Sequence, residues 1–184
     1  MKEEIREIFN NVNEWLKFAE AKNFGLLSLT AAIVFGFLQI EFAKNSSFEQ
    51  FVIWTISIVA FLSFFPSILS LFPIVSKIEK GENLKNWIST FSNWIDKETS
   101  FENIHFYGYL RSIDTVEFER KFLNKLNIPT QSLNQYEKEL VGQILYNSRI
   151  TWLKYQLFKI GAFFFLVGFL VFLPLGLLIF NFIN

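Results

Sequence analysis

Three long stretches of the chain contain no charged residue, and each is long enough to cross a lipid bilayer as a helix. They cover residues 23–40, 51–76 and 160–184. The hydrocarbon layer of a bilayer is about 30 Å thick, which a helix crosses with roughly 20 residues. Buried helices of water-soluble domains are rarely so long and so uniformly apolar. The pattern therefore predicts three transmembrane helices, at residues 25–43, 51–76 and 160–183.

Residues 1–24 have the pattern of an amphipathic helix that continues into the first span. Apolar side chains recur every three or four positions, and charged side chains fill the opposite side. Neither proline nor glycine interrupts the stretch before Gly25. The segment carries acids and lacks the basic excess of a lipid-binding helix, so we expect its apolar face to pack on protein. That face comprises Ile5, Ile8, Phe9, Val12, Trp15, Leu16 and Ala19.

The polar stretch between the second and third spans, residues 77–159, has the pattern of a small helical domain. An apolar stripe between residues 84 and 95 predicts a first helix. A second, over residues 115–126, is predicted by Asp114 followed by Glu117, with Ile113 and Phe118 as a hydrophobic staple. The stripe of the first helix comprises Leu84, Trp87, Ile88, Phe91 and Ile95.

Two further features complete this domain. Ser132 and Gln135 have the spacing of a capping box, and the helix that they would open continues unbroken into the third span. Residues 100–112 are rich in aromatic side chains, and their spacing follows no single period and forms no long helical stripe. This pattern predicts a turn-rich segment or one short helix. The predicted fold is an all-α membrane protein whose first and last helices extend below the membrane into a small helical cytosolic domain.

The basic residues predict which way the spans face. Four precede the first span, one lies between the first two spans, twelve lie in residues 77–159, and none follows the third span. Cytoplasmic segments of membrane proteins are enriched in Lys and Arg. We therefore expect the N-terminus and the main soluble domain in the cytoplasm, and the C-terminus on the other side.

Small side chains predict where the spans pack closely. On the first span they are Gly25, Ser28, Ala32 and Gly36, and on the third Gly161 and Gly168. The second span has serines at positions 57, 63, 67 and 70 and prolines at positions 66 and 73. These polar residues indicate either a water-lined, movable helix or a packed helix whose serines bond back to their own carbonyls, and we favour the second interpretation.

Composition narrows the possible functions. Hydrophobic residues make up 52% of the chain and the formal net charge is zero, which gives no reason to expect nucleic-acid binding. There is no cysteine, and His105 is the single histidine, so the usual metal sites are not expected. Phosphate-binding loops and catalytic motifs are missing as well, so we do not predict an enzyme.

One group of residues has the chemistry to hold an anionic ligand that stacks on aromatic rings, such as a nucleotide. It combines four bases with two tyrosines that lie near them in the sequence. The alternative is a solvated helix face whose bases are neutralised by Glu117 and Glu119. The group comprises Tyr107, Tyr109, Arg111, Arg120, Lys121 and Lys125.

Three stretches in succession resemble the transmembrane effectors of Pycsar antiphage systems. The first, Glu14 to Asn23 (EWLKFAEAKN), leads directly into a span. The second is Asn103 to Gly108 (NIHFYG), followed by TVEF at residues 115–118. The third is Glu137 to Ile144 (EKELVGQI), followed by NSRI at residues 147–150 and by Lys154 and Tyr155. The resemblance covers nearly the whole chain.

The resemblance implies an antiviral role in the inner membrane of a bacterium. In such systems a neighbouring cyclase makes cyclic UMP or cyclic CMP, and the effector then disrupts the membrane and causes abortive infection. The implied partners are the lipid bilayer, the cyclic pyrimidine nucleotide as activating ligand, and further copies of the chain. The alternative is an accessory membrane scaffold that docks a cytosolic protein without responding to a ligand.

Overall fold

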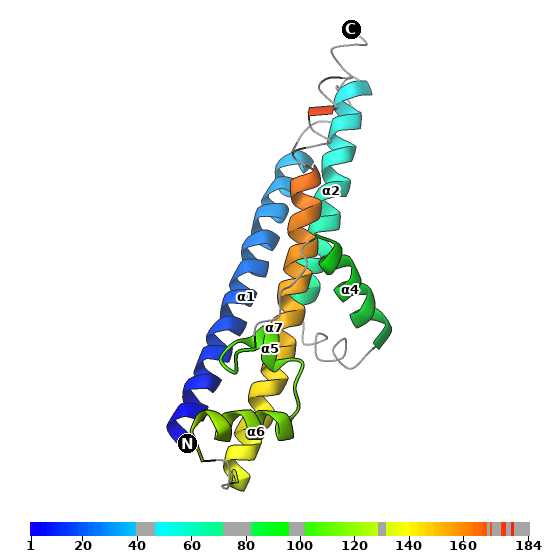
Figure 1. Cartoon of the computed structure of the whole chain (residues 1–184). Coiled ribbons are helices and arrows are strands. Elements are labelled where there is room, and N and C mark those ends of the chain that lie inside the picture. The colour runs from blue at the N-terminus through cyan, green and yellow to red at the C-terminus, as the bar shows by residue number, and fades with distance from the viewer. Residues whose placement is uncertain are drawn as a thin grey trace.

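The computed structural model describes residues 1–39, 47–71, 82–95, 102–128, 132–168, 170, 174, 175 and 178. The described part is helical and contains no strand, which confirms the predicted all-α fold. Its elements are α1 (Lys2–Leu38), α2 (Ser47–Leu71), α4 (Glu82–Ile95), α5 (Tyr107–Leu110), α6 (Thr115–Lys125) and α7 (Gln135–Val167) (Figure 1).

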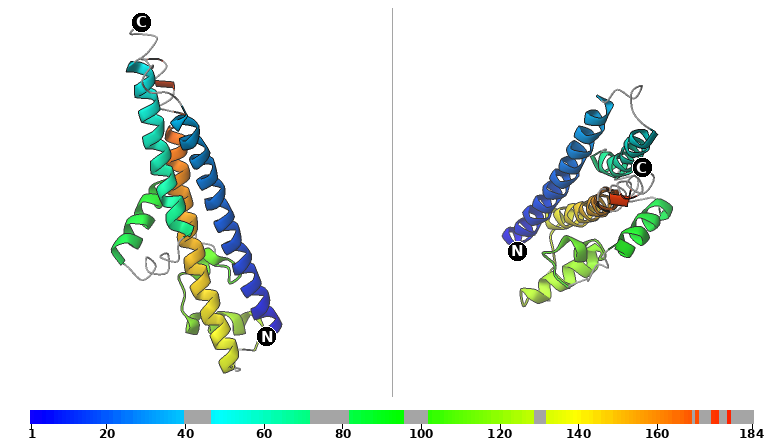
Figure 2. Two further views of the ribbon diagram at one scale, coloured as in Figure 1. Left: turned by 180° about the vertical axis from the view of Figure 1, so that it is seen from behind. Right: turned by 90° about the horizontal axis from the view of Figure 1, so that it is seen from above.

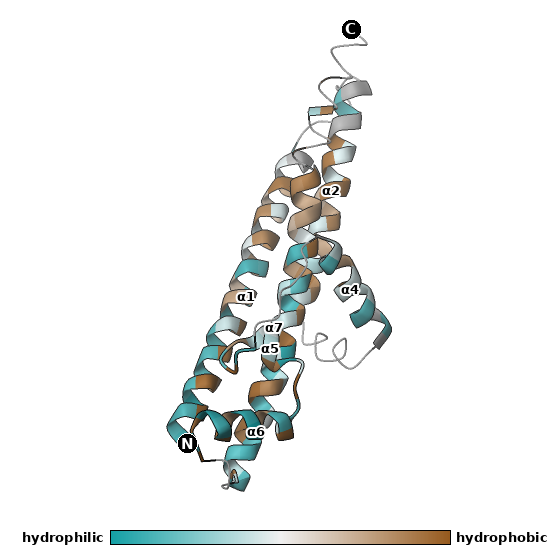
Figure 3. Ribbon diagram, in the orientation of Figure 1, coloured by the Kyte–Doolittle hydropathy of each residue, from teal (hydrophilic) through white to brown (hydrophobic). Residues whose placement is uncertain are grey.

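The helices α1, α2 and α7 form an elongated bundle with a polar end and an apolar end (Figures 2 and 3). Each has a stretch long and apolar enough to cross a membrane, which confirms the three predicted spans. At the polar end, α5 and α6 pack against α7, and α4 lies along the outside of α7 (Figure 1). The predicted span ends at 40–43 and 72–76, Pro73, and most of the third span beyond Val167 lie outside the described residues.

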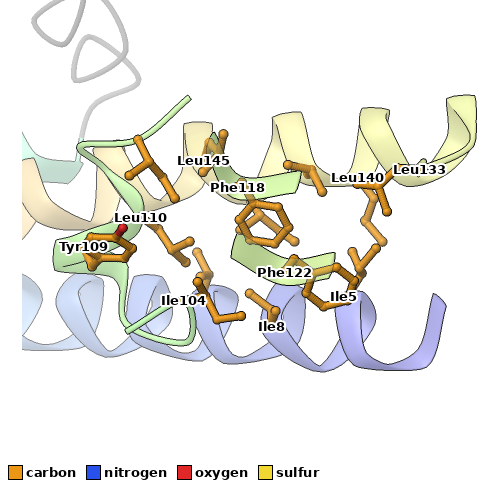
Figure 4. Close-up of a cluster of buried hydrophobic side chains, with 14 of the residues drawn as sticks. Ile5, Ile8, Ile104, Tyr109, Leu110, Phe118, Phe122, Leu133, Leu140 and Leu145 are labelled. Carbon is orange, nitrogen blue, oxygen red and sulfur yellow. The ribbon is translucent and has the colours of Figure 1, made fainter. Parts of the chain in front are cut away.

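The core of the polar end forms between α1, α6 and α7 (Figure 4). Ile5 and Ile8 of α1 and Phe118 of α6 are completely buried there. Burying one such side chain contributes about 1.5–3 kcal/mol, which explains why α1 stays attached to the body below the spans. The prediction that the apolar face of α1 packs on protein is therefore confirmed, although Trp15 at its margin is 37% exposed.

The predicted start of α6 is confirmed, whereas the predicted start of α7 was wrong by two residues. Asp114 caps α6, with its Oδ1 accepting a 2.8 Å hydrogen bond from the backbone N–H of Glu117. The capping box of α7 is formed by Asn134 and Glu137, and the predicted pair, Ser132 and Gln135, does not form it. The reason is that the backbone N–H of Leu133 donates a 2.7 Å hydrogen bond to the Glu119 carboxylate, which holds the chain before the helix begins.

Polar contacts join α1 to α7 at intervals just below the predicted spans. The Asn147 amide donates to Asn13 at 3.0 Å, and the Lys154 ammonium pairs with Glu20 at 2.6 Å. The amide of the fully buried Asn23 bridges the helices, because it donates to the Lys154 carbonyl oxygen at 3.0 Å. Two helices that exchange such bonds over this length have a defined register relative to one another.

Several buried polar atoms of α1 and α7 have no hydrogen-bond partner within the described part of the chain. They are the Asn23 Oδ1, Thr151 Oγ1, Tyr155 hydroxyl and Gln156 Oε1 atoms. Three of them belong to α7, between Thr151 and Gln156. Such atoms are rare in packed interiors, because each lacks the bonds that water would provide. The junction between α1 and α7 is thus tightly packed and incompletely satisfied.

Within the spans, α7 approaches α2 through its glycines, as predicted. A Cβ atom on Gly161 would lie 3.0 Å from the carbonyl oxygen of Ser63 and 3.0 Å from Leu26 Cδ2, and one on Gly168 would collide with Val59. The Ser63 hydroxyl donates to the Val59 carbonyl, and the Ser67 hydroxyl to the Ser63 carbonyl. For these two serines the interpretation of a packed helix is therefore correct.

The small residues of the first span have a different place. Gly25, Ser28, Ala32 and Gly36 lie on the exposed side of α1. Nothing lies within 4 Å of a Cβ built on Gly25 or Gly36. Within one copy of the chain, the close contacts of α1 therefore use the face that carries Asn23, Leu26 and Thr30, each of them buried.

The different surroundings of Gly161 and Gly25 predict opposite sensitivities. Gly161→Val should destabilise the protein by about 1–3 kcal/mol, because the added methyl groups overpack the contact between α7 and α2. Gly25→Val makes the same chemical change in open space, and we expect little loss. Thermal unfolding of both variants in detergent tests this, and equal melting temperatures would contradict the packing described here.

Candidate functional site

A small cleft lined by three basic side chains lies where α4, the segment after α5, and α7 meet. Lys85 comes from α4, Arg111 directly follows α5, and Arg149 comes from α7. Trp152 and Leu153 complete its wall, and its volume of about 40 Å³ holds a few water molecules or one small anion. Cations brought together from three separate elements are typical of a site that binds a negatively charged group.

Arg111 is held in place on the ring of Trp152, which lines this cleft. Its guanidinium lies 4.0 Å from the centre of the Trp152 ring, and its Nε atom donates a 3.2 Å hydrogen bond to the Gly108 carbonyl oxygen. Trp152 itself is only 3% exposed. A guanidinium that is stacked on a ring and hydrogen-bonded through Nε has a fixed orientation, and its planar fork of donors matches the geometry of a phosphate.

An aromatic cluster lies beside the cleft and connects α5 to α1 and α7. Tyr107 stacks on Tyr155, with 5.2 Å between the ring centres and 11° between the planes. Trp15 of α1 lies 5.6 Å from Tyr107. Because Tyr107 is buried among these rings, its role in this conformation is to position the short helix that precedes Arg111.

Lys121 belongs to a separate polar network on α6. Its ammonium contacts the Tyr109 hydroxyl, and it lies 3.3 Å from Glu102 and 3.4 Å from Glu117. The hydrogen bond to Tyr109 is the main reason why the pKa of Lys121 is raised, with Glu102 adding to the effect. Two carboxylates therefore compete with any anion that would approach Lys121.

The other two predicted bases lie on the same helix. The Lys125 ammonium lies 3.1 Å from the Nε2 atom of His105. Burial lowers the pKa of His105, and the charge of Lys125 lowers it further, so the imidazole is neutral and accepts this hydrogen bond. Arg120 is exposed to solvent.

The six predicted ligand-binding residues thus lie in several places, and their role in binding stays a prediction. Arg111 lines the basic cleft, Tyr107 packs in the cluster that includes Trp152 and Leu153 of the cleft wall, and the remaining four residues lie on or beside α6. Sequence reasoning missed Lys85 and Arg149, which lie far from Arg111 along the chain. The one available signal was that Arg149 falls within a stretch similar to the effector family. Among the described residues, no group of three His, Asp or Glu side chains gathers as a metal site requires.

Comparison with known proteins gives one match that covers almost the whole chain. The model of the family described as "Pycsar effector protein domain" matches residues 4–181 of the 184 residues. No curated protein matches the chain, and no solved structure does. The matched segment includes the first two predicted spans, all but the last two residues of the third, and every residue of the basic cleft.

The environment of His105 predicts a dependence of stability on pH. Because the folded state lowers the pKa of His105, the unfolded state binds its proton more readily, and stability falls as the pH decreases below the ordinary histidine value. Between about pH 7.5 and 5.5, wild type should therefore lose more thermal stability than His105→Gln. Parallel melting curves in detergent test this, and an equal loss in both proteins would contradict it.

Proposed function

Because the chain belongs to the Pycsar effector family, and is therefore a membrane effector of a Pycsar antiphage system, we propose that a cyclic pyrimidine nucleotide switches it to a membrane-damaging state. The family implies a signal made by a cyclase, and the proposed ligand is cyclic UMP or cyclic CMP. The proposed place of action is the bacterial inner membrane, with the polar end of the molecule in the cytoplasm. Infected cells would then stop growing before new phage are released.

The basic cleft is the observation that carries this proposal. A cyclic nucleotide bears one negative charge on its phosphate, and Lys85, Arg111 and Arg149 offer three positive charges in one place. The cleft has room for the phosphate alone, so the sugar and base would lie outside it, toward the surface between α4 and α5. Charge-assisted hydrogen bonds from arginine to phosphate are among the stronger polar interactions in proteins.

The continuity of α7 supports a route from the cleft to the membrane. Arg149 and Gly161 lie on the same helix, twelve residues apart, which corresponds to roughly 18 Å along its axis. Gly161 is the residue at which α7 packs closely on α2. A change in the position of α7 at Arg149 would therefore reach the contact between two spans without passing through a flexible linker.

Ligand binding changes the membrane only if the active arrangement binds the ligand more tightly than the resting one. In the proposed mechanism, the phosphate draws α4 and the segment after α5 toward α7. The shift of α7 then alters how the spans pack within a homo-oligomer, and the bilayer becomes permeable. No covalent step is required, which agrees with the expectation that the protein is not an enzyme.

Substitution of the cleft arginines tests the proposed ligand site. Arg149→Gln and Arg111→Gln should each weaken binding of cyclic UMP or cyclic CMP by about tenfold or more, since each removes a charged donor to the phosphate. Arg120→Gln is the matched control, because it removes the same charge from an exposed position on α6. Isothermal titration calorimetry on detergent-purified protein measures all three affinities, and melting curves confirm that the variants are folded.

Two outcomes would contradict the proposed site. Unchanged affinity in both cleft variants would exclude the cleft, and a loss with Arg120→Gln alone would move the site to α6. In cells, coexpression with a pyrimidine cyclase should collapse the membrane potential reported by a voltage-sensitive dye. Growth arrest with an intact potential would contradict membrane damage, and the absence of any response to the cyclase would instead support the scaffold alternative.

A further inference from the structure

Helix α4 carries an aromatic face that is largely exposed. Its inner side packs on α7 and carries Ile88, which is 1% exposed, and the fully buried Ser92. The opposite side presents Trp87, which is 57% exposed, and Trp94, which is 71% exposed. We call this side the outer face of α4; it comprises Asn83, Asn86, Trp87, Thr90, Asn93 and Trp94.

The outer face lacks the charged residues of a helix that faces water. No Asp, Glu, Lys or Arg occurs from Asn86 to Ile95, a run of ten residues. Two tryptophans seven residues apart fall on one side of a helix, separated by about two turns. Amphipathic aromatic rings accompanied by small amides and hydroxyls are typical of the layer between lipid headgroups and hydrocarbon.

Contacts with α7 place this helix at the depth where a span begins. Trp94 lies 5.5 Å from Phe163, and Phe91 stacks on Phe164 at 5.8 Å. Lys159, four residues before Phe163, is the last charged residue of the chain. The C-terminal half of α4 is therefore level with the first turn of the uncharged stretch of α7.

We propose that the outer face of α4 docks into the interfacial layer of the bilayer on the side of the polar end, with Trp94 deepest. The lipid surface is the occupant that fits, because Trp94 of this face lies against Phe163, where the uncharged stretch of α7 begins. This docking goes beyond the proposed response to a nucleotide, and it does not depend on any ligand being bound. It also fixes the angle at which the bundle meets the membrane.

The absence of cysteine in the chain allows a direct test with single labels. Trp94→Cys and Thr90→Cys place a fluorescent NBD group on the outer face, and Thr90→Cys leaves both tryptophans intact. Asn124→Cys places the same label on an exposed position of α6, far from the spans. Full-length protein is reconstituted in phosphatidylcholine nanodiscs with or without a lipid that carries a doxyl quencher high on its acyl chain.

The expected result is a loss of about half of the NBD fluorescence at positions 90 and 94, with little loss at position 124, since quenching requires contact with lipid. Iodide in the aqueous phase should instead quench the label strongly at position 124 and weakly at positions 90 and 94. Iodide quenching at position 94 as strong as at position 124 would overturn the proposal. Protection from iodide without quenching by doxyl lipid would overturn it too, because a protein surface would then cover the helix.

Discussion

The pairing of α1 with α7 is the interaction on which the rest of the molecule depends. Each helix runs from the polar end into the apolar end, so the same two elements form the core below the membrane and part of the bundle within it. Ile5 and Ile8 hold them together at one end, and Asn23 bonds them where the apolar stretch begins. The shorter helices α5 and α6 then only need to fill the space beside this pair.

Most of the fold could be predicted from the sequence because its signals are local. A helical period of apolar residues and a long uncharged run depend only on neighbouring positions, and they gave α1, α4, α6 and the three spans. The start of α7 was less certain, since Asn134 and Glu137 have the same spacing as Ser132 and Gln135. A hydrogen bond between Leu133 and Glu119, fourteen residues apart, decided between the two pairs.

The site was harder to predict because it is assembled from distant segments. Arg111 was identified from its neighbours, whereas Lys85 and Arg149 join it only through the packing of α4 on α7. Within the first span, the side of α1 that packs was also beyond local reasoning, because it depends on where α2 and α7 lie. Sequence spacing shows which residues share a face of a helix, but it does not show what that face meets.

The unpartnered polar atoms at the junction of α1 and α7 affect how easily water can enter between these two helices. Water that entered there would give Asn23 and Tyr155 the hydrogen bonds that the packed state denies them. If the two helices separate at this level, hydration of these polar atoms lowers the free energy of the separated state. A contact made only of aliphatic side chains would not have this effect. Hydration would thus begin most easily at the threshold of the bilayer, directly below the contact between Gly161 and α2.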